Sequence, residues 1–313
     1  MSLRIIKSGL LDTIQDAGRY GYQHLGINPG GVMDTIAMRV ANMLVGNDLS
    51  EAVIEMHFPA AEIAFEETTL IALAGADLTA AVDEKEIPIL HPVIIQKGAV
   101  LKFEKKQTSA RIYLAVKGGI VCDDWLQSKS TNSKVKAGGY KGRALQKNDR
   151  IFFKEKKVHA LQGIDNTADI FPWYAKVSEL YVSNIFRFIA GNEYWLLNEE
   201  SKHALVKESF SISRENDRMG YRLSGVGLHL ETKKEMISTA VTRGTMQLLP
   251  DGQMIILMAD HQTTGGYPRV GHIISADISS LAQMQAGEKF SLHQVTLADA
   301  EEILSVQEMN LKQ

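Results

Sequence analysis

Five consecutive hydrogen-bonding side chains follow an apolar run, "MIILM", and precede two glycines, a tyrosine and a proline: Asp260, His261, Gln262, Thr263 and Thr264. A buried strand that ends in such a run must satisfy these groups internally or present them to a ligand. The His261 imidazole titrates near neutrality, at about 6.5 when unperturbed, so it can move protons or hold an anion. We therefore predict that this stretch lines a pocket. A turn satisfied by its own hydrogen bonds is the alternative.

The residues after His261 suit a polar, planar ligand. Gln262, Thr263 and Thr264 supply neutral donors and acceptors. Gly265 and Gly266 allow the main chain to approach a ligand closely. We predict that these five residues and the following Tyr267 bind substrate.

Two further stretches carry arginines that could recognise an anion. In "SRENDRMGYRLSG", we predict that Asp217 binds substrate and that the planar fork of Arg218 binds a carboxylate or phosphate; a structural ion pair is the alternative. In "SKSTNSKVKAGGYKGRAL", three glycines and Arg143 predict a loop that binds an anion with its backbone N–H groups, and a solvated loop is the alternative. The lone Cys122 is predicted to be structural.

A fourth polar stretch, residues 13–34, comes before the first predicted helix. Asp34 is placed to cap that helix. Gln15, Asp16 and Arg19 are predicted to form a network that locks a turn.

Short apolar segments separated by Gly, Asn and Asp must position these side chains, and this rhythm is typical of strands joined by tight turns. The sequence predicts a mainly β fold with a few short helices. Strands are expected at 111–116, 150–155, 186–190, 227–231 and 254–258. Helices are expected at 34–46, at 277–287, and after Thr296, which opens a capping box.

The length of 313 residues exceeds the usual size of one core, so we predict two domains, 1–178 and 179–313. A net charge of −3 without a basic block argues against nucleic acid, and the apolar runs are too short for a membrane span. One cysteine and no apolar leader indicate the cytoplasm. There is no Walker A pattern and no zinc-like cluster.

Four segments occur in an order that resembles one protein family: "GLLDTIQDAGRYGYQHLGINPGGVMD", "ANMLVGN", "NDRMGYRLSG" and "LMADHQTTGGYP". The chain is similar to the family of 5-oxoprolinase C subunits, also known as biotin-dependent carboxyltransferase family proteins, KipI antagonists (KipA) and allophanate hydrolase subunit 2. The resemblance covers about 5–295 and implies two cyclophilin-like β-barrel domains. The family usually has arginine where this chain has Lys129.

The resemblance implies one component of a hydrolase that opens 5-oxo-L-proline to L-glutamate with ATP. The A and B subunits of 5-oxoprolinase, the latter KipI-like, are the implied partners, without which the chain is inactive. A lactam is a poor electrophile, and phosphorylating its oxygen would make the ring carbon attackable by water. The site must therefore stabilise anionic charge. Under this interpretation Arg218 and Arg143 bind carboxylate or phosphate, and His261 transfers protons, with Asp260 either orienting it or binding a neighbouring amide.

Two other functions stay open. One is carboxyl transfer from carboxybiotin to urea or a related amide, with biotin supplied by a partner. The other is a regulator without catalytic activity that binds a KipI-like kinase inhibitor.

Overall fold

The computed structural model describes residues 1–105, 108–154, 167–182, 184–232 and 236–311. The chain divides into two compact units. Unit 1 comprises Met1–Arg19 and Gly30–Lys176, and unit 2 comprises Tyr20–Pro29 and Val177–Gln313. The sequence-based boundary assigned the segment Tyr20–Pro29 to the N-terminal domain; the extents 1–178 and 179–313 stay a prediction.

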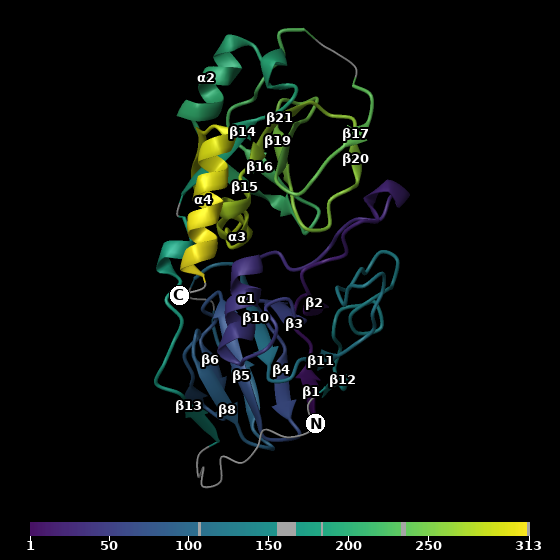
Figure 1. The fold of residues 1–313 in the computed structure, drawn as a ribbon, viewed down its shortest axis with the longest axis vertical. Helices are drawn as coiled ribbons and strands as arrows, with labels where there is room; N and C mark the ends of the chain where they lie inside the picture. The colour runs from purple at the N-terminus through teal and green to yellow at the C-terminus, as the bar shows by residue number, and fades with distance from the viewer. Residues whose placement is uncertain (106–107, 155–166, 183, 233–235, 312–313) are drawn as a thin grey trace. The chain divides into compact units, whose positions relative to one another are not determined.

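Unit 1 is built from two mainly antiparallel sheets (Figure 1). The seven-stranded sheet has the order β11 (Ile120–Val121), β12 (Arg150–Phe153), β1 (Ser2–Lys7), β4 (Glu62–Phe65), β9 (Val100–Phe103), β6 (Ala80–Val82) and β7 (Lys85–Glu86). The six-stranded sheet has the order β13 (Ala168–Ile170), β8 (Pro92–Ile95), β5 (Thr69–Gly75), β10 (Arg111–Val116), β3 (Val53–His57) and β2 (Thr13–Gln15).

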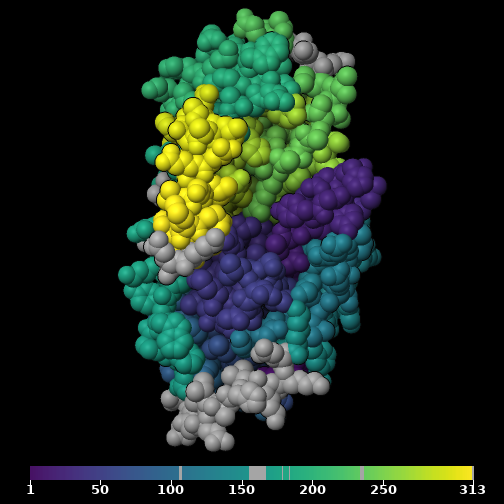
Figure 2. Space-filling view, viewed as in Figure 1, coloured from purple at the N-terminus to yellow at the C-terminus, as the bar shows by residue number. Residues whose placement is uncertain are grey.

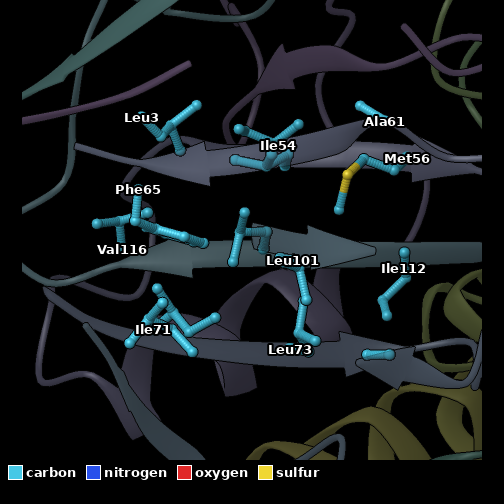
Figure 3. Close-up of a cluster of buried hydrophobic side chains, with 14 of the residues drawn as sticks. Leu3, Ile54, Met56, Ala61, Phe65, Ile71, Leu73, Leu101, Ile112 and Val116 are labelled. Atoms are coloured by element: carbon cyan, nitrogen blue, oxygen red, sulfur yellow. The ribbon is translucent and has the colours of Figure 1, made fainter. Parts of the chain in front are cut away.

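The side chains of each strand point alternately to its two faces, and this explains which residues form the core of unit 1. In β10, Ile112, Leu114 and Val116 belong to one buried apolar cluster with Leu3 of β1 and Leu101 of β9, and Figure 3 shows this cluster between the strands. The intervening Tyr113 lies on the opposite face, where α1 (Thr35–Leu44) packs against β5 and β10. Both faces of β10 are therefore buried, which accounts for its continuous apolar sequence.

The predicted first helix is confirmed as α1. Asp34 caps it, because its Oδ1 accepts a hydrogen bond from the Ala37 N–H at 2.9 Å. The helix ends before Gly46, which has a left-handed φ of 68°.

Unit 2 contains a closed barrel, and the mainly β prediction is confirmed. Its strands follow the order β14 (Ile185–Ala190), β21 (Arg269–Ile273), β18 (Thr245–Leu248), β19 (Met254–Leu257), β16 (Gly220–Ser224), β15 (Ser209–Asn216) and β22 (Lys289–Gln294). The parallel pairing of β14 with β22 closes the barrel. A small separate sheet joins β17 (Thr239–Ala240) to β20 (Thr264–Gly265).

Helices flank this barrel. They are α2 (Glu199–Lys207), α3 (Ile278–Ala282) and α4 (Leu297–Asn310), with 3-10 turns at η1 (Gln23–Leu25), η2 (Ser178–Leu180), η3 (Tyr194–Leu196) and η4 (Ser275–Asp277). The predicted capping box of Thr296 is confirmed at the start of α4. Figure 2 shows α4, in yellow, at the surface, which agrees with the absence of buried residues within it. The helix α2 was not predicted.

One strand prediction was wrong, and one helix prediction was too long. Residues 227–231 form no strand, only an isolated bridge between Leu230 and Leu197. The helix expected at 277–287 is only α3, and Asp277 does not cap it. The carboxylate of Asp277 instead accepts hydrogen bonds from the backbone N–H and the guanidinium of Arg187 on β14.

The strand expected at 150–155 is β12, which ends at Phe153, and Glu155 lies outside the described residues.

Candidate functional site in unit 2

The Asp260–Tyr267 segment connects β19 to β21 in the barrel wall. The predicted strand at 254–258 is β19, and after it the backbone still pairs with the turn before β16. The Met258 N–H donates to the Met219 carbonyl at 2.9 Å, and the Asp260 N–H donates to the Arg218 carbonyl at 2.7 Å. The predicted polar run therefore begins from a fixed position on the barrel.

Arg218 and Asp260 form an ion pair in this position. The Arg218 Nε donates to Asp260 Oδ2 at 2.9 Å, and its Nη2 donates to Oδ1 at 3.2 Å. The Arg218 side chain is only 9% exposed. The structural ion pair considered from the sequence is thus present, and a substrate-binding role for either residue stays a prediction.

His261 is 2% exposed, and its Nδ1 lies 2.6 Å from the Gln262 carbonyl oxygen. A carbonyl can only accept, so Nδ1 carries the proton and Nε2 is left as the basic nitrogen. Burial lowers the pKa of His261; the bond to Gln262 raises it, while the charge of Arg243 lowers it further. The nearby His272 also has a pKa lowered by burial. His261 is therefore neutral near pH 7, as a proton acceptor must be.

The next residues cover the outer side of β18. The Gln262 Nε2 donates to Gln247 Oε1 at 3.3 Å, and the Thr263 carbonyl accepts from the Val241 N–H at 3.1 Å. Thr264 exposes its side chain and pairs through β20 with Ala240 of β17. Sequence reasoning missed Gln247; the signal available was one amide inside the apolar run "MQLL".

Two hollows border the segment, both lined by residues of unit 2. A groove of about 470 Å³ is lined by Gln262, Asp217, Arg222, Ile255 and their neighbours. A larger cavity of about 830 Å³ is lined by Gly266, Tyr267 and mainly apolar residues, among them Leu228 and Leu248. Of the predicted site residues, Gln262 and Asp217 line the groove and Gly266 and Tyr267 line the cavity, whereas His261, Thr263, Thr264 and Gly265 belong to neither lining.

Asp217 shapes the turn that begins β16. Its Oδ1 accepts from the backbone N–H of Met219 at 2.7 Å and of Gly220 at 3.2 Å. This is the local hydrogen bonding expected of Asp in a turn. Its predicted contact with substrate stays a prediction.

Arg143 belongs to unit 1, unlike the other predicted site residues. Its guanidinium contacts both carboxylate oxygens of Asp149, at 2.6 and 2.9 Å. Burial raises the pKa of Asp149, but the hydrogen bonds from Arg143 and from the Gln146 N–H, together with the positive charges of Arg143 and Lys141, outweigh burial and hold that pKa below its ordinary value. Arg143 is therefore already paired with a carboxylate, and an anion-binding role stays a prediction.

The network predicted around Asp16 is present in unit 1. Its carboxylate accepts from the hydroxyls of Ser128 and Ser130 at 2.7 and 2.6 Å and from the Lys129 N–H at 2.6 Å. Arg19 donates to the Ser130 carbonyl. The two polar stretches of unit 1 are therefore bound to each other, and Lys129 pairs with Glu51 at 2.6 Å.

Burial raises the pKa of the Cys122 thiol to about 12, which favours the predicted structural role over a nucleophile. No group of three His, Cys, Asp or Glu side chains suited to a metal ion occurs among the residues that the structure describes. In the same described ranges, no helix is both long and apolar enough to cross a membrane.

Comparison with known proteins identifies relatives over nearly the whole chain. It is 35% identical over 298 residues to the C subunit of 5-oxoprolinase from Escherichia coli, covering 95% of this chain and 93% of that protein. It is 32% identical to the protein of the same name from Haemophilus influenzae, covering 96% and 94%. It is also 26% identical to "Urea amidolyase" of Saccharomyces cerevisiae, covering 99% of this chain but only 18% of that protein.

The fold matches a solved structure, the urea amidolyase of K. lactis, with a TM-score of 0.89 and 22% identity. The match covers 99% of this chain and 20% of that one. The family model described as "Carboxyltransferase domain, subdomain A and B" matches residues 25–294. The chain therefore belongs to the carboxyltransferase domain family of subdomains A and B.

Proposed function

We propose that this chain is the C subunit of an ATP-dependent 5-oxoprolinase and helps convert 5-oxo-L-proline to L-glutamate. The observation that carries the proposal is its nearly full-length identity of 35% and 32% to two proteins that bear this name. Relatives named for urea amidolyase or urea carboxylase match at 24–28% and are several times longer.

The site in unit 2 supports chemistry on a small cyclic amide. The Gln262 amide lines a groove and offers both an acceptor and a donor to a lactam. The neutral His261 retains a basic Nε2 for proton transfer. The Arg218–Asp260 ion pair fixes the start of the segment. We therefore propose that this pair orients His261, in preference to a role in which it contacts an anion directly.

The ATP requirement is assigned to the assembly, because the chain carries no Walker A pattern. A lactam needs activation by phosphorylation of its oxygen before water can attack the ring carbon. We therefore propose that the A subunit and a KipI-like B subunit of 5-oxoprolinase are required and that this chain alone is inactive.

Carboxyl transfer is the second candidate, favoured by the family description and by the urea carboxylase relatives. The ureido ring of biotin is also a small cyclic amide, so the Gln262 groove suits it chemically. This function requires a partner that carries biotin.

Reconstitution from this chain and the separately purified A and B subunits tests the proposal. We expect release of glutamate and ADP from 5-oxoproline and ATP only when all three are present. Robust turnover by this chain alone, or unchanged turnover by its two partners without it, contradicts the proposal. A parallel reaction with urea, bicarbonate, ATP, a biotin carboxylase and biotinylated carrier protein tests carboxyl transfer.

A further inference from the structure

Gln247 is a buried amide whose hydrogen bonding is incomplete. The side chain lies on β18 and is 0% exposed. Its Oε1 accepts the Nε2 of Gln262 at 3.3 Å, while its own Nε2 has no hydrogen-bond partner among the described residues. Burying an amide donor without a partner costs stability, so a packed apolar side chain would be the more stable choice at this position.

The amide lies beneath the Asp260–Tyr267 segment. Met246 on the same strand is fully buried opposite Ile256, so Gln247 points to the other face of the barrel wall. A Cβ placed on Gly265 would lie 2.3 Å from the Gln247 Nε2. The chain therefore passes directly over the amide, and a side chain at 265 would displace the Gln247 amide from this position.

Gln262 connects this buried amide to the groove. Its side chain lines the groove of about 470 Å³ beside Asp217 and Ile255. One hydrogen of its Nε2 is directed to Gln247, which fixes the plane of the Gln262 amide. The Gln262 Oε1 takes no part in this bond and can accept an N–H group of a ligand in the groove.

We propose that Gln247 is a positioning residue, which holds the Gln262 amide so that its Oε1 accepts the ring N–H of a small cyclic amide. The inference rests on the proposed function and names the group by which the substrate is recognised. A site built to pair with a substrate N–H discriminates against an analogue that lacks it. Gln247 thus contributes to specificity without contacting the ligand.

The test is Gln247→Met in the reconstituted assembly of all three subunits. Methionine matches the length of glutamine and removes the unpaired donor, so the melting temperature should stay equal or rise. The KM for 5-oxoproline should rise about tenfold with a smaller change in kcat, as expected for one lost hydrogen bond. The matched control is Gln283→Met, a buried glutamine in the same unit that lies outside the groove lining.

A second measurement separates positioning from a structural role. The lactone analogue 5-oxotetrahydrofuran-2-carboxylate lacks the ring N–H, and its intrinsic reactivity cancels when two enzyme forms are compared. The wild-type preference for lactam over lactone, as a ratio of kcat/KM values, should fall about tenfold in Gln247→Met. An unchanged preference, or an equal loss with both substrates, overturns the inference. Absence of 5-oxoprolinase activity in the wild-type assembly would instead overturn the proposed function, and with it this inference.

Discussion

The carboxyl group of Asp12 is 1% exposed and accepts a hydrogen bond from the Gly9 N–H at 3.0 Å. Burial raises its pKa from 3.8 to about 7, against the opposing effect of backbone N–H groups. The folded state therefore holds this proton more tightly than the unfolded state. As the pH rises from 3.8 to about 7, the wild type therefore loses the part of its free energy of unfolding that this proton contributes.

Asp12→Asn is therefore expected to change the pH dependence of unfolding. Asparagine keeps an acceptor and never ionises. As the pH rises from 5 to 7, the free energy of unfolding of the variant should therefore increase by about 2 kcal/mol relative to that of the wild type. Urea unfolding at several pH values measures this difference. The control is Asp48→Asn, which replaces an exposed carboxylate in the same unit. A stability difference between Asp12→Asn and the wild type that stays constant with pH would refute the raised pKa of Asp12.

His261→Ala should lower kcat of the reconstituted assembly by about 10²–10⁴-fold, the range for loss of a general acid or base. Far-UV circular dichroism should show an unchanged fold. His203→Ala on the exposed side of α2 is the matched control. Full activity of the His261 variant would remove this residue from the mechanism.

Local residue roles were predictable, and long-range partners were not. Asp34 caps a helix that begins at the next residue, so the sequence contained the whole interaction. Arg218 and Asp260 are 42 residues apart, and only the pairing of the barrel strands brings them together. Gln247 was missed for the same reason, because its partner Gln262 lies on another segment.

At the scale of elements, α4 depends on its first turn. The Thr296 Oγ1 accepts from the Asp299 N–H at 3.2 Å, and Asp299 Oδ2 accepts from the Thr296 N–H at 3.0 Å. No residue within α4 is buried, so packing contributes little to its start. Farther along, the Gln307 Nε2 donates to the carbonyls of Leu180 and Ala276.

Thr296→Ala removes the cap and is expected to destabilise α4 by about 1 kcal/mol. Native-state hydrogen exchange of the amides in α4 measures the effect. Thr296→Ser retains the hydroxyl and should behave as the wild type. Equal exchange in the alanine variant would show that the contacts of Gln307 hold the helix without the cap.

The element errors have physical causes. Residues 227–231 alternate as a strand would, but that pattern does not supply a neighbouring strand with which to pair. Asp277 precedes an apolar helical pattern, yet the guanidinium of Arg187 competes for its carboxylate and bonds to it more strongly than a backbone N–H could. A hydrophobic pattern in the sequence predicts which secondary structures a segment can form, and tertiary contacts decide which of these structures the folded chain adopts.

At the scale of the whole chain, the barrel joins strands that are distant in sequence. β14 begins at Ile185, and its parallel partner β22 ends at Gln294. The barrel should therefore open as one cooperative unit. In native-state hydrogen exchange, we expect the amides of β14, β18 and β22 to share one opening free energy, with α4 exchanging faster. Separate, much faster exchange of β22 would contradict this prediction.

The closed barrel also restricts how a partner can bind. A closed ring of strands has no edge to which an extended segment could add by β-augmentation. In the part of the chain that the structure describes, unpaired strand edges belong to the open sheets, at β7, β11, β13 and β2 in unit 1 and in the small β17–β20 sheet. Among the described strands, these are the edges that strand addition by a partner protein could use, whereas a partner that docks on the barrel wall would recognise its side chains.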